Sequence, residues 1–154
     1  MKMSRTLRIG LLLLGFAVYA ASFPLVAVKE TGSGGASFIG YRCALLTLTA
    51  PWGQGAPEML HDKPGEYFAW LFSGWINPFF IAAMVASLVR PKGRIAAILR
   101  IVTLLMFAAC WFVFYMERLR PHTGYFLWTG GMLLVLLPSM FSTENRELKA
   151  AGGA

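Results

Sequence analysis

The apolar positions of the chain fall into four long runs separated by short polar stretches. These runs cover residues 9–28, 67–89, 95–116 and 125–141. A hydrocarbon core of about 30 Å takes roughly 17–25 helical residues to cross, and each run has a length in that range. A backbone exposed to lipid must satisfy its own hydrogen bonds, so each run should be helical. The pattern therefore predicts an all-α integral membrane protein with four transmembrane helices.

The composition supports this prediction. The 154 residues are 57% hydrophobic and 14% charged, with a mean hydropathy of +0.60. Soluble domains are about 45–50% apolar and about 25% charged, so an ordinary soluble domain is excluded. The net charge of +7 is scattered between the apolar runs and forms no single basic face. We therefore expect the lipid bilayer, and no nucleic acid, among the partners of the chain.

Basic residues are unevenly distributed between the two sides of the predicted helices. One side has an excess of cations, whereas on the other side five cations are balanced by five acids. By the positive-inside rule, the basic side is cytoplasmic. This predicts a multi-pass protein of a bacterial inner membrane with both termini and the hairpin "RPKGR" in the cytoplasm. The cations of the basic side are Lys2, Arg5, Arg8, Arg90, Lys92, Arg94, Arg146 and Lys149.

The remaining segments are too short to form separate domains. Residues 29–66 form an expected extracytoplasmic loop of about 38 residues, which is below the roughly 40 that fold without disulfides or metals. Residues 142–154 form a short polar tail on the cytoplasmic side. We therefore expect one membrane domain over residues 1–154.

The segment "SFIGYRCALLTLTAPWG" within this loop raises the question of a fifth span. A fifth span would place the basic hairpin outside, against the charge bias. Arg42 near its middle would cost roughly 2.5–3.5 kcal/mol in a membrane, and "LLTLTA" alternates apolar and hydroxyl residues as a strand does. We expect residues 37–52 to lie on the outer leaflet, with a re-entrant hairpin as the alternative.

The first apolar run has a second interpretation as a cleaved signal peptide. Lys2, Arg5 and Arg8 resemble its basic segment, and "AVYAA" offers small residues for cleavage. The run is longer than the usual 7–15 residues of such a peptide, so an uncleaved span is favoured.

Three residues inside the predicted spans are candidates for a structural or gating role. Pro78 removes a helical hydrogen bond and should kink the second helix. Asn77 at the same level can bond a neighbouring helix or the freed carbonyl. Arg100 is the single charge within a span. An intramembrane cation is a functional candidate, but its long side chain is expected to snorkel to the cytoplasmic headgroups.

The tryptophans are concentrated on the predicted outer side. An interfacial belt would place such rings at both surfaces, so the asymmetry favours recognition of a protein partner there, with a lipid belt as the alternative. The candidate partner-binding residues are Trp52, Trp70, Trp75, Trp128 and Tyr125.

Histidine and cysteine give weaker signals. His61 and His122 lie in the two outer loops near acidic or proline residues, but no metal-binding spacing is present, so we expect no metal. Cys43 and Cys110 are both on the outer side, where an oxidising compartment would allow a bridge. Two unpaired cysteines are the favoured interpretation.

No arrangement of catalytic side chains lies at a common depth, so an enzyme is the least favoured class and no cofactor is expected. We expect a non-enzymatic protein that binds a partner in the membrane or periplasm, either an accessory subunit or an immunity-type protein that blocks a membrane-active toxin. The alternative is a small oligomeric transporter or channel, a homo-oligomer with the Asn77–Pro78 break in its pore.

Overall fold

A computed structural model of the chain describes residues 5–31, 36–90 and 93–141. The expected cytoplasmic tail at 142–154 and part of the basic hairpin lie outside these ranges. The described residues form helices α1 (Arg5–Ser22), α2 (Gly40–Thr49), α3 (Ala56–Asp62), α4 (Pro64–Val89), α5 (Arg94–Met116) and α6 (Thr123–Phe141), the 3₁₀ turn η1 (Ala50–Trp52), and strands β1 (Val26–Glu30), β2 (Ser37–Ile39) and β3 (Leu119–Pro121).

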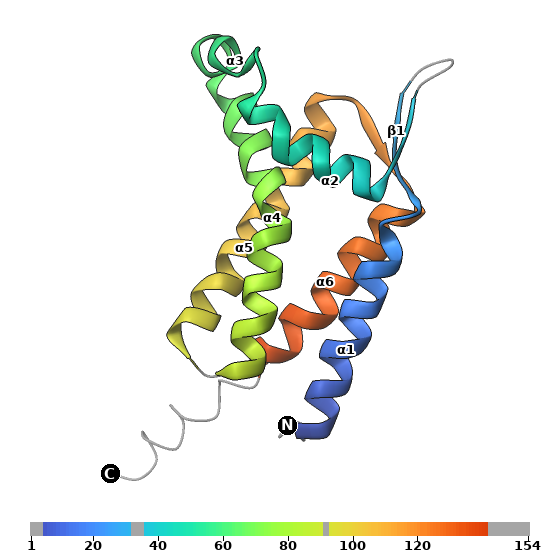
Figure 1. The fold of residues 1–154 in the computed structure, drawn as a ribbon, viewed down its shortest axis with the longest axis vertical. Coiled ribbons are helices and arrows are strands. Elements are labelled where there is room, and N and C mark those ends of the chain that lie inside the picture. The colour runs from blue at the N-terminus through green and yellow to red at the C-terminus, as the bar shows by residue number, and fades with distance from the viewer. Residues whose placement is uncertain (1–4, 32–35, 91–92, 142–154) are drawn as a thin grey trace.

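The four long helices form two pairs, α1 with α6 and α4 with α5, which together make an elongated bundle (Figure 1). Helices α1 and α6 approach closely at small residues. A Cβ atom added to Gly131 would lie 2.5 Å from the backbone nitrogen of Tyr19 and 2.7 Å from the carbonyl oxygen of Gly15. The buried core of the bundle contains Leu12, Tyr19, Ile76, Phe80, Ala83, Met106, Cys110, Met132, Val135 and Leu136.

Two of these helices, α4 and α5, are long and apolar enough to cross a bilayer by length and composition. Their 26 and 23 residues correspond to about 39 and 35 Å of helix at 1.5 Å per residue. Helices α1 and α6 contain shorter apolar stretches, Thr6–Ser22 and Thr123–Leu137. The helical class predicted from the sequence fits the structure, and two helices of spanning length are consistent with membrane association.

The first apolar run contains less helix than expected. Helix α1 ends at Ser22. The last residues of the predicted run belong to strand β1, which continues to Glu30. The residue before Pro24 is restricted to extended conformations, which stops the helix there. The hydroxyl of Ser22 donates to the carbonyl of Tyr19 at 2.6 Å and so satisfies one of the free carbonyls of the last turn.

The expected outer loop is folded rather than irregular. Strand β1 lies between β2 and β3 in an antiparallel sheet of order β2-β1-β3, so it joins the two segments predicted as separate outer loops. Val28 faces Phe38 on one side and Pro121 on the other. We refer to this sheet together with α2, η1 and α3 as the cap; it covers the end of the bundle opposite the N-terminus (Figure 1).

Residues 37–52 contain a helix, so the strand interpretation of "LLTLTA" was wrong. The hydroxyls of Thr47 and Thr49 donate to the carbonyls of Cys43 and Leu45, four residues earlier, at 3.0 and 2.9 Å. Because these bonds satisfy the hydroxyls within the helix, the alternation of apolar and hydroxyl residues does not indicate a strand here. Helix α2 has 10 residues, about 15 Å, so it is too short for a fifth span. It lies across the bundle and meets α4 where Gly74 contacts the backbone of Thr47.

Candidate functional site: a cavity beneath the cap

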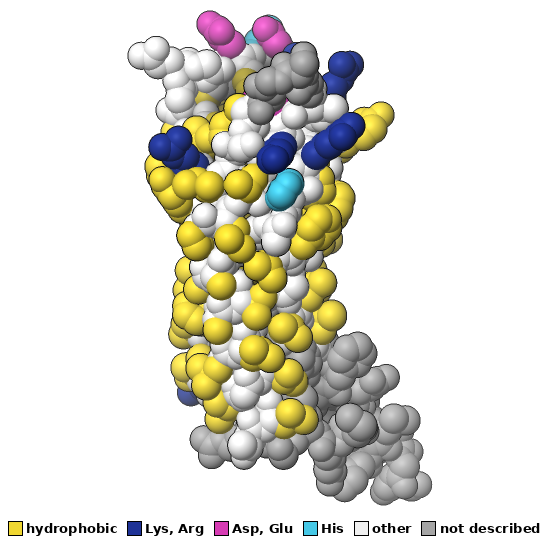
Figure 2. Space-filling model, turned by 90° about the vertical axis from the view of Figure 1, so that its right-hand side faces the viewer, with side chains coloured by type: hydrophobic (Ala, Val, Ile, Leu, Met, Phe, Trp, Pro, Cys, Tyr) yellow, Lys and Arg dark blue, Asp and Glu magenta, His cyan; other side chains and the backbone are white. Residues whose placement is uncertain are grey.

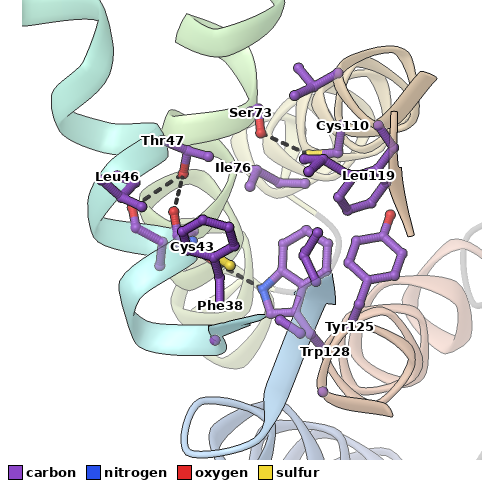
Figure 3. A pocket seen from close by; sticks show the side chains of 18 of the residues that line it. Phe38, Cys43, Leu46, Thr47, Ser73, Ile76, Cys110, Leu119, Tyr125 and Trp128 are labelled. Atoms are coloured by element: carbon purple, nitrogen blue, oxygen red, sulfur yellow. Dashed lines mark hydrogen bonds between the residues drawn. The ribbon is translucent and has the colours of Figure 1, made fainter. Parts of the chain in front are cut away.

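A cavity of about 220 Å³ lies where the cap meets the bundle. Its wall includes residues from all four long helices, from α2, and from all three strands. Figure 3 shows Cys43, Leu46 and Thr47 of α2 on one side, Ser73 and Ile76 of α4 and Cys110 of α5 on another, and Tyr125 and Trp128 of α6 opposite α2. The cavity is mainly apolar, with a small number of polar groups in its wall.

Asn77 is the central polar residue of this region. Its Oδ1 accepts one hydrogen bond from the Tyr19 hydroxyl and one from Trp128 Nε1, both at 2.9 Å. Because the indole nitrogen can only donate, the atom facing it must be the amide oxygen, and this fixes the orientation of the amide. Asn77 therefore connects α4 to α1 and to α6. The expectation that it bonds a neighbouring helix is confirmed.

Helix α4 continues through Pro78 without interruption. The proline ring is exposed on the outside of the bundle. The side chain of Asn77, one position earlier, is turned towards α1 and α6, so Asn77 and Pro78 lie on different faces of α4. Asn77 joins helices, and Pro78 faces the surroundings.

Tyr125 is buried beside the cavity, with only 5% of its surface exposed. Its ring packs edge to face against Phe114 at a centroid distance of 4.6 Å and against Trp111 at 5.7 Å. Neither its hydroxyl nor that of Thr129 completes a hydrogen bond of ordinary geometry with any residue that the structure describes. A buried hydroxyl without a partner costs about 1–3 kcal/mol, so this group requires an explanation.

Both cysteines line the cavity and both are free thiols. Cys110 Sγ donates to Ser73 Oγ at 3.4 Å, which joins α5 to α4. Burial raises the pKa of the Cys43 thiol to about 11. The favoured interpretation of two unpaired cysteines agrees with the structure.

Among the residues that the structure describes, the charged residues in the wall of the cavity are two glutamates, Glu30 of β1 and Glu117 just after α5. Both are exposed at the cap end of the molecule. Glu117 Oε1 accepts a hydrogen bond from Trp70 Nε1 at 3.3 Å, and Glu30 Oε2 accepts one from the backbone of Ala36 at 3.3 Å. The charged part of the wall is therefore acidic.

The five candidate partner-binding residues do not share one surface. Trp52 on η1 is 67% exposed and Trp75 on α4 is 39% exposed, whereas Trp70 is half-buried and bonded to Glu117. Trp128 and Tyr125 instead line the cavity. The sequence placed Trp52 in the outer loop and the other four in the outer parts of helices, but it could not distinguish inward from outward rings.

Arg100 does not extend to the surface of the bundle. Only 2% of its surface is exposed, and its Nε donates to the carbonyl of Ala96 at 2.8 Å. Ala96 lies one turn nearer the start of α5, so the side chain turns back towards the predicted cytoplasmic end of its helix. Contact of the guanidinium with the headgroups stays a prediction.

The histidines lie apart from the cavity and are exposed. His61 Nδ1 pairs with Asp62 Oδ1 at 2.7 Å on α3, while His122 follows β3. Among the described residues, no group of three or more histidine, cysteine or acidic side chains is placed to hold a metal ion.

Sequence reasoning missed the cavity and three polar residues next to it, Tyr19, Ser73 and Thr47. A hydroxyl inside an apolar run was the available signal for Tyr19, because a phenol in a span needs a partner. The partner itself, 58 residues away on another helix, could not be identified from spacing. Comparison of the chain with protein-family models, with curated proteins and with solved structures finds no match.

Proposed function

We propose that the chain is a four-span inner-membrane protein. The proposal is supported by a belt of exposed apolar side chains around the bundle. Contact of so large an apolar surface with water would be unfavourable. In Figure 2 apolar side chains cover the length of the bundle, and charged side chains are found towards its ends. Members of this apolar belt include Leu13, Leu14, Phe72, Ile81, Val85, Leu88, Ile98, Ile101, Leu105, Phe112 and Phe126.

The proposed orientation places the cap outside the cytoplasm. The N-terminal end of α1, the C-terminal end of α4 and the N-terminal end of α5 lie at one end of the bundle, and the cap lies at the other (Figure 1). Arg90 and Arg94 belong to the first end. A bacterial inner membrane retains such basic flanks on its cytoplasmic side.

Within this topology we propose that the protein is non-enzymatic and binds another protein of the membrane or periplasm through its cap. The supporting observation is Trp52, a 67% exposed indole on η1, next to the buried Pro51 that holds the turn. Helix α2 of the cap also exposes apolar side chains, Tyr41, Leu45 and Leu46. Tryptophan is enriched among the few residues that carry most of the energy of protein interfaces.

The test is partner retention on affinity-tagged protein purified in mild detergent. Trp52→Ala should weaken retention by more than about 2 kcal/mol. Trp75→Ala, on the apolar belt, is the matched control and should retain the partner. If Trp52→Ala retains the partner as well as the wild type does, or if both variants lose it equally, the cap proposal is wrong.

A transporter or channel is the second candidate, because the cavity reaches the Asn77–Pro78 level of α4. In this case the purified protein would form a homo-oligomer and make liposomes leak ions. A stoichiometric complex with a different protein and tight liposomes would exclude it.

A further inference from the structure

Two basic residues lie directly opposite each other on the sheet of the cap. In the antiparallel pair of β1 and β3, Lys29 faces Arg120, and both residues are exposed. Side chains paired in this way are close neighbours on one face of the sheet, and like charges there destabilise the pairing. Among the residues that the structure describes, neither cation forms an ion pair with an acid. The repulsion between these two strands is therefore not compensated within the described part of the chain.

The same two residues line a hollow on the surface of the cap, together with His122, which follows β3. An arginine side chain has five N–H donors, a lysine has three, and an imidazole has at least one. Among the described residues of this wall the acid is Glu30. Its Oε2 accepts a hydrogen bond from the backbone nitrogen of Ala36 at 3.3 Å, on the β2 side of β1, whereas Arg120 lies on the β3 side. The wall therefore carries two formal positive charges against one negative charge.

The hollow lies where the apolar belt meets the cap. The backbone nitrogen of Phe126 donates to the carbonyl of His122 at 3.2 Å, so Phe126 follows one helical turn later, in α6. Its side chain is 58% exposed and belongs to the belt. Figure 2 shows basic side chains and a histidine gathered on one face, between the apolar length of the bundle and the tip of the cap. In the proposed four-span topology this is the level of the lipid headgroups, where basic residues meet phosphate.

We infer that this hollow binds the phosphate group of an anionic phospholipid, whose oxygens accept hydrogen bonds from Lys29 and Arg120. An anionic headgroup complements the excess of positive charge in the wall, whereas a zwitterionic headgroup brings a cation of its own. A lipid fits better than a soluble phosphate ester, because its acyl chains can cover the exposed apolar surface at Phe126. The inference rests on the proposed membrane location of the bundle. It does not depend on partner binding through Trp52, which does not line the hollow.

The test measures which phospholipid lies next to Phe126. Full-length protein with Phe126→Cys, in which Cys43 and Cys110 are replaced by alanine, is labelled with a bimane fluorophore and placed in nanodiscs of phosphatidylcholine. Increasing shares of this lipid are replaced by brominated phosphatidylglycerol or by brominated phosphatidylcholine, because a brominated acyl chain quenches a fluorophore that it contacts. The two quenching curves give the relative association constant of the two lipids. Both leaflets contain the brominated lipid, so the result does not depend on which side the cap faces.

We expect phosphatidylglycerol to be favoured about fivefold over phosphatidylcholine at position 126, as one uncompensated positive charge near a membrane surface provides. A bimane at Leu105→Cys, on a 66% exposed position of α5 in the belt, should show no preference. Quenching at position 105 shows that the bundle is in lipid. Loss of the preference at position 126 alone would therefore refute the hollow without refuting the membrane proposal.

Variants of the wall should change the preference in opposite directions. Lys29→Gln or Arg120→Gln should each abolish it, and Glu30→Gln should increase it about fivefold. Arg42→Gln, which removes an exposed cation of the cap outside the hollow, is the matched control and should leave the preference unchanged. Removal of one of two facing like charges should not destabilise the sheet, so the first two variants should unfold as the wild type does.

Other results would overturn the inference. Equal association of the two lipids with the wild type excludes a site for an anionic headgroup. A preference that persists in Lys29→Gln and Arg120→Gln removes the role of these residues, and an equal loss in Arg42→Gln would show only a general effect of surface charge. A preference that excess glycerol phosphate in the buffer abolishes would assign the hollow to a soluble phosphate ester instead of a lipid.

Discussion

Replacing Asn77 with leucine should destabilise the bundle by breaking its link between α4, α1 and α6. The change keeps the side chain of similar size but removes the oxygen that accepts from Tyr19 and Trp128, each at 2.9 Å. Interhelical hydrogen bonds in membranes contribute roughly 0.6–2 kcal/mol each, so the loss of two should cost about 1–4 kcal/mol.

The assay is reversible unfolding in mixed micelles of increasing dodecyl sulfate content, followed by circular dichroism. Trp128→Phe keeps one aromatic ring and removes the Nε1 donor together with part of the indole, so a double-mutant cycle with Asn77→Leu is needed to separate the hydrogen bond from the lost packing. We expect a coupling energy of about 0.6–2 kcal/mol between the two positions. The same cycle with Trp75→Phe should be additive, because the Trp75 ring is partly exposed on the belt.

Additivity of Asn77→Leu and Trp128→Phe within about 0.3–0.5 kcal/mol would refute the link. A wild-type free energy of unfolding in Asn77→Leu alone would refute it equally.

Two further predictions concern close packing and the cavity thiol. Gly131→Ala should destabilise the α1–α6 pair by about 1–3 kcal/mol, since its Cβ would lie 2.5 Å from Tyr19 N. The control is Gly130→Ala, whose added Cβ meets no atom within 4 Å. In the same unfolding assay this variant should be neutral or more stable by up to about 1 kcal/mol. Equal losses in both variants would contradict the packing. Because the pKa of Cys43 is raised to about 11, the thiolate is scarce at neutral pH, and iodoacetamide labelling in a Cys110→Ala chain should accelerate by about tenfold per pH unit until pH approaches that value. An exposed thiol at Gln54→Cys should instead level off near its ordinary pKa of about 8.5, and a Cys43 profile that levels off there would show that the thiol is solvated.

The long helices could be predicted from the sequence because their signal is local. Apolar runs anticipated α4, α5 and α6 to within a few residues, and "RPKGR" separated α4 from α5. The end of α1 was placed six residues too late. Apolar residues continue past Ser22, and the weight of Pro24 as a helix stop was missed.

The cap and cavity depend on contacts between distant segments, which a pattern along one chain does not encode. Strand β1 is recognisable as a strand only with its partners β2 and β3, the latter some 90 residues away. Asn77 was identified because an amide in an apolar run needs a partner. The buried position of Arg100 and the inward orientation of Tyr125 follow from packing between helices, so they required the structure.

The proposals for the cap depend on the topology, and one labelling measurement tests the topology most directly. In a chain lacking both native cysteines, Gly55→Cys places a thiol in the cap, where an added side chain meets no atom within 4 Å. Arg90→Cys places one at the opposite end of the bundle, on an exposed position after α4. Intact cells with a permeable outer membrane are treated with an impermeant maleimide. The account predicts labelling of position 55 from outside and of position 90 only after the inner membrane is permeabilised; external labelling of position 90, or protection of position 55, would contradict it.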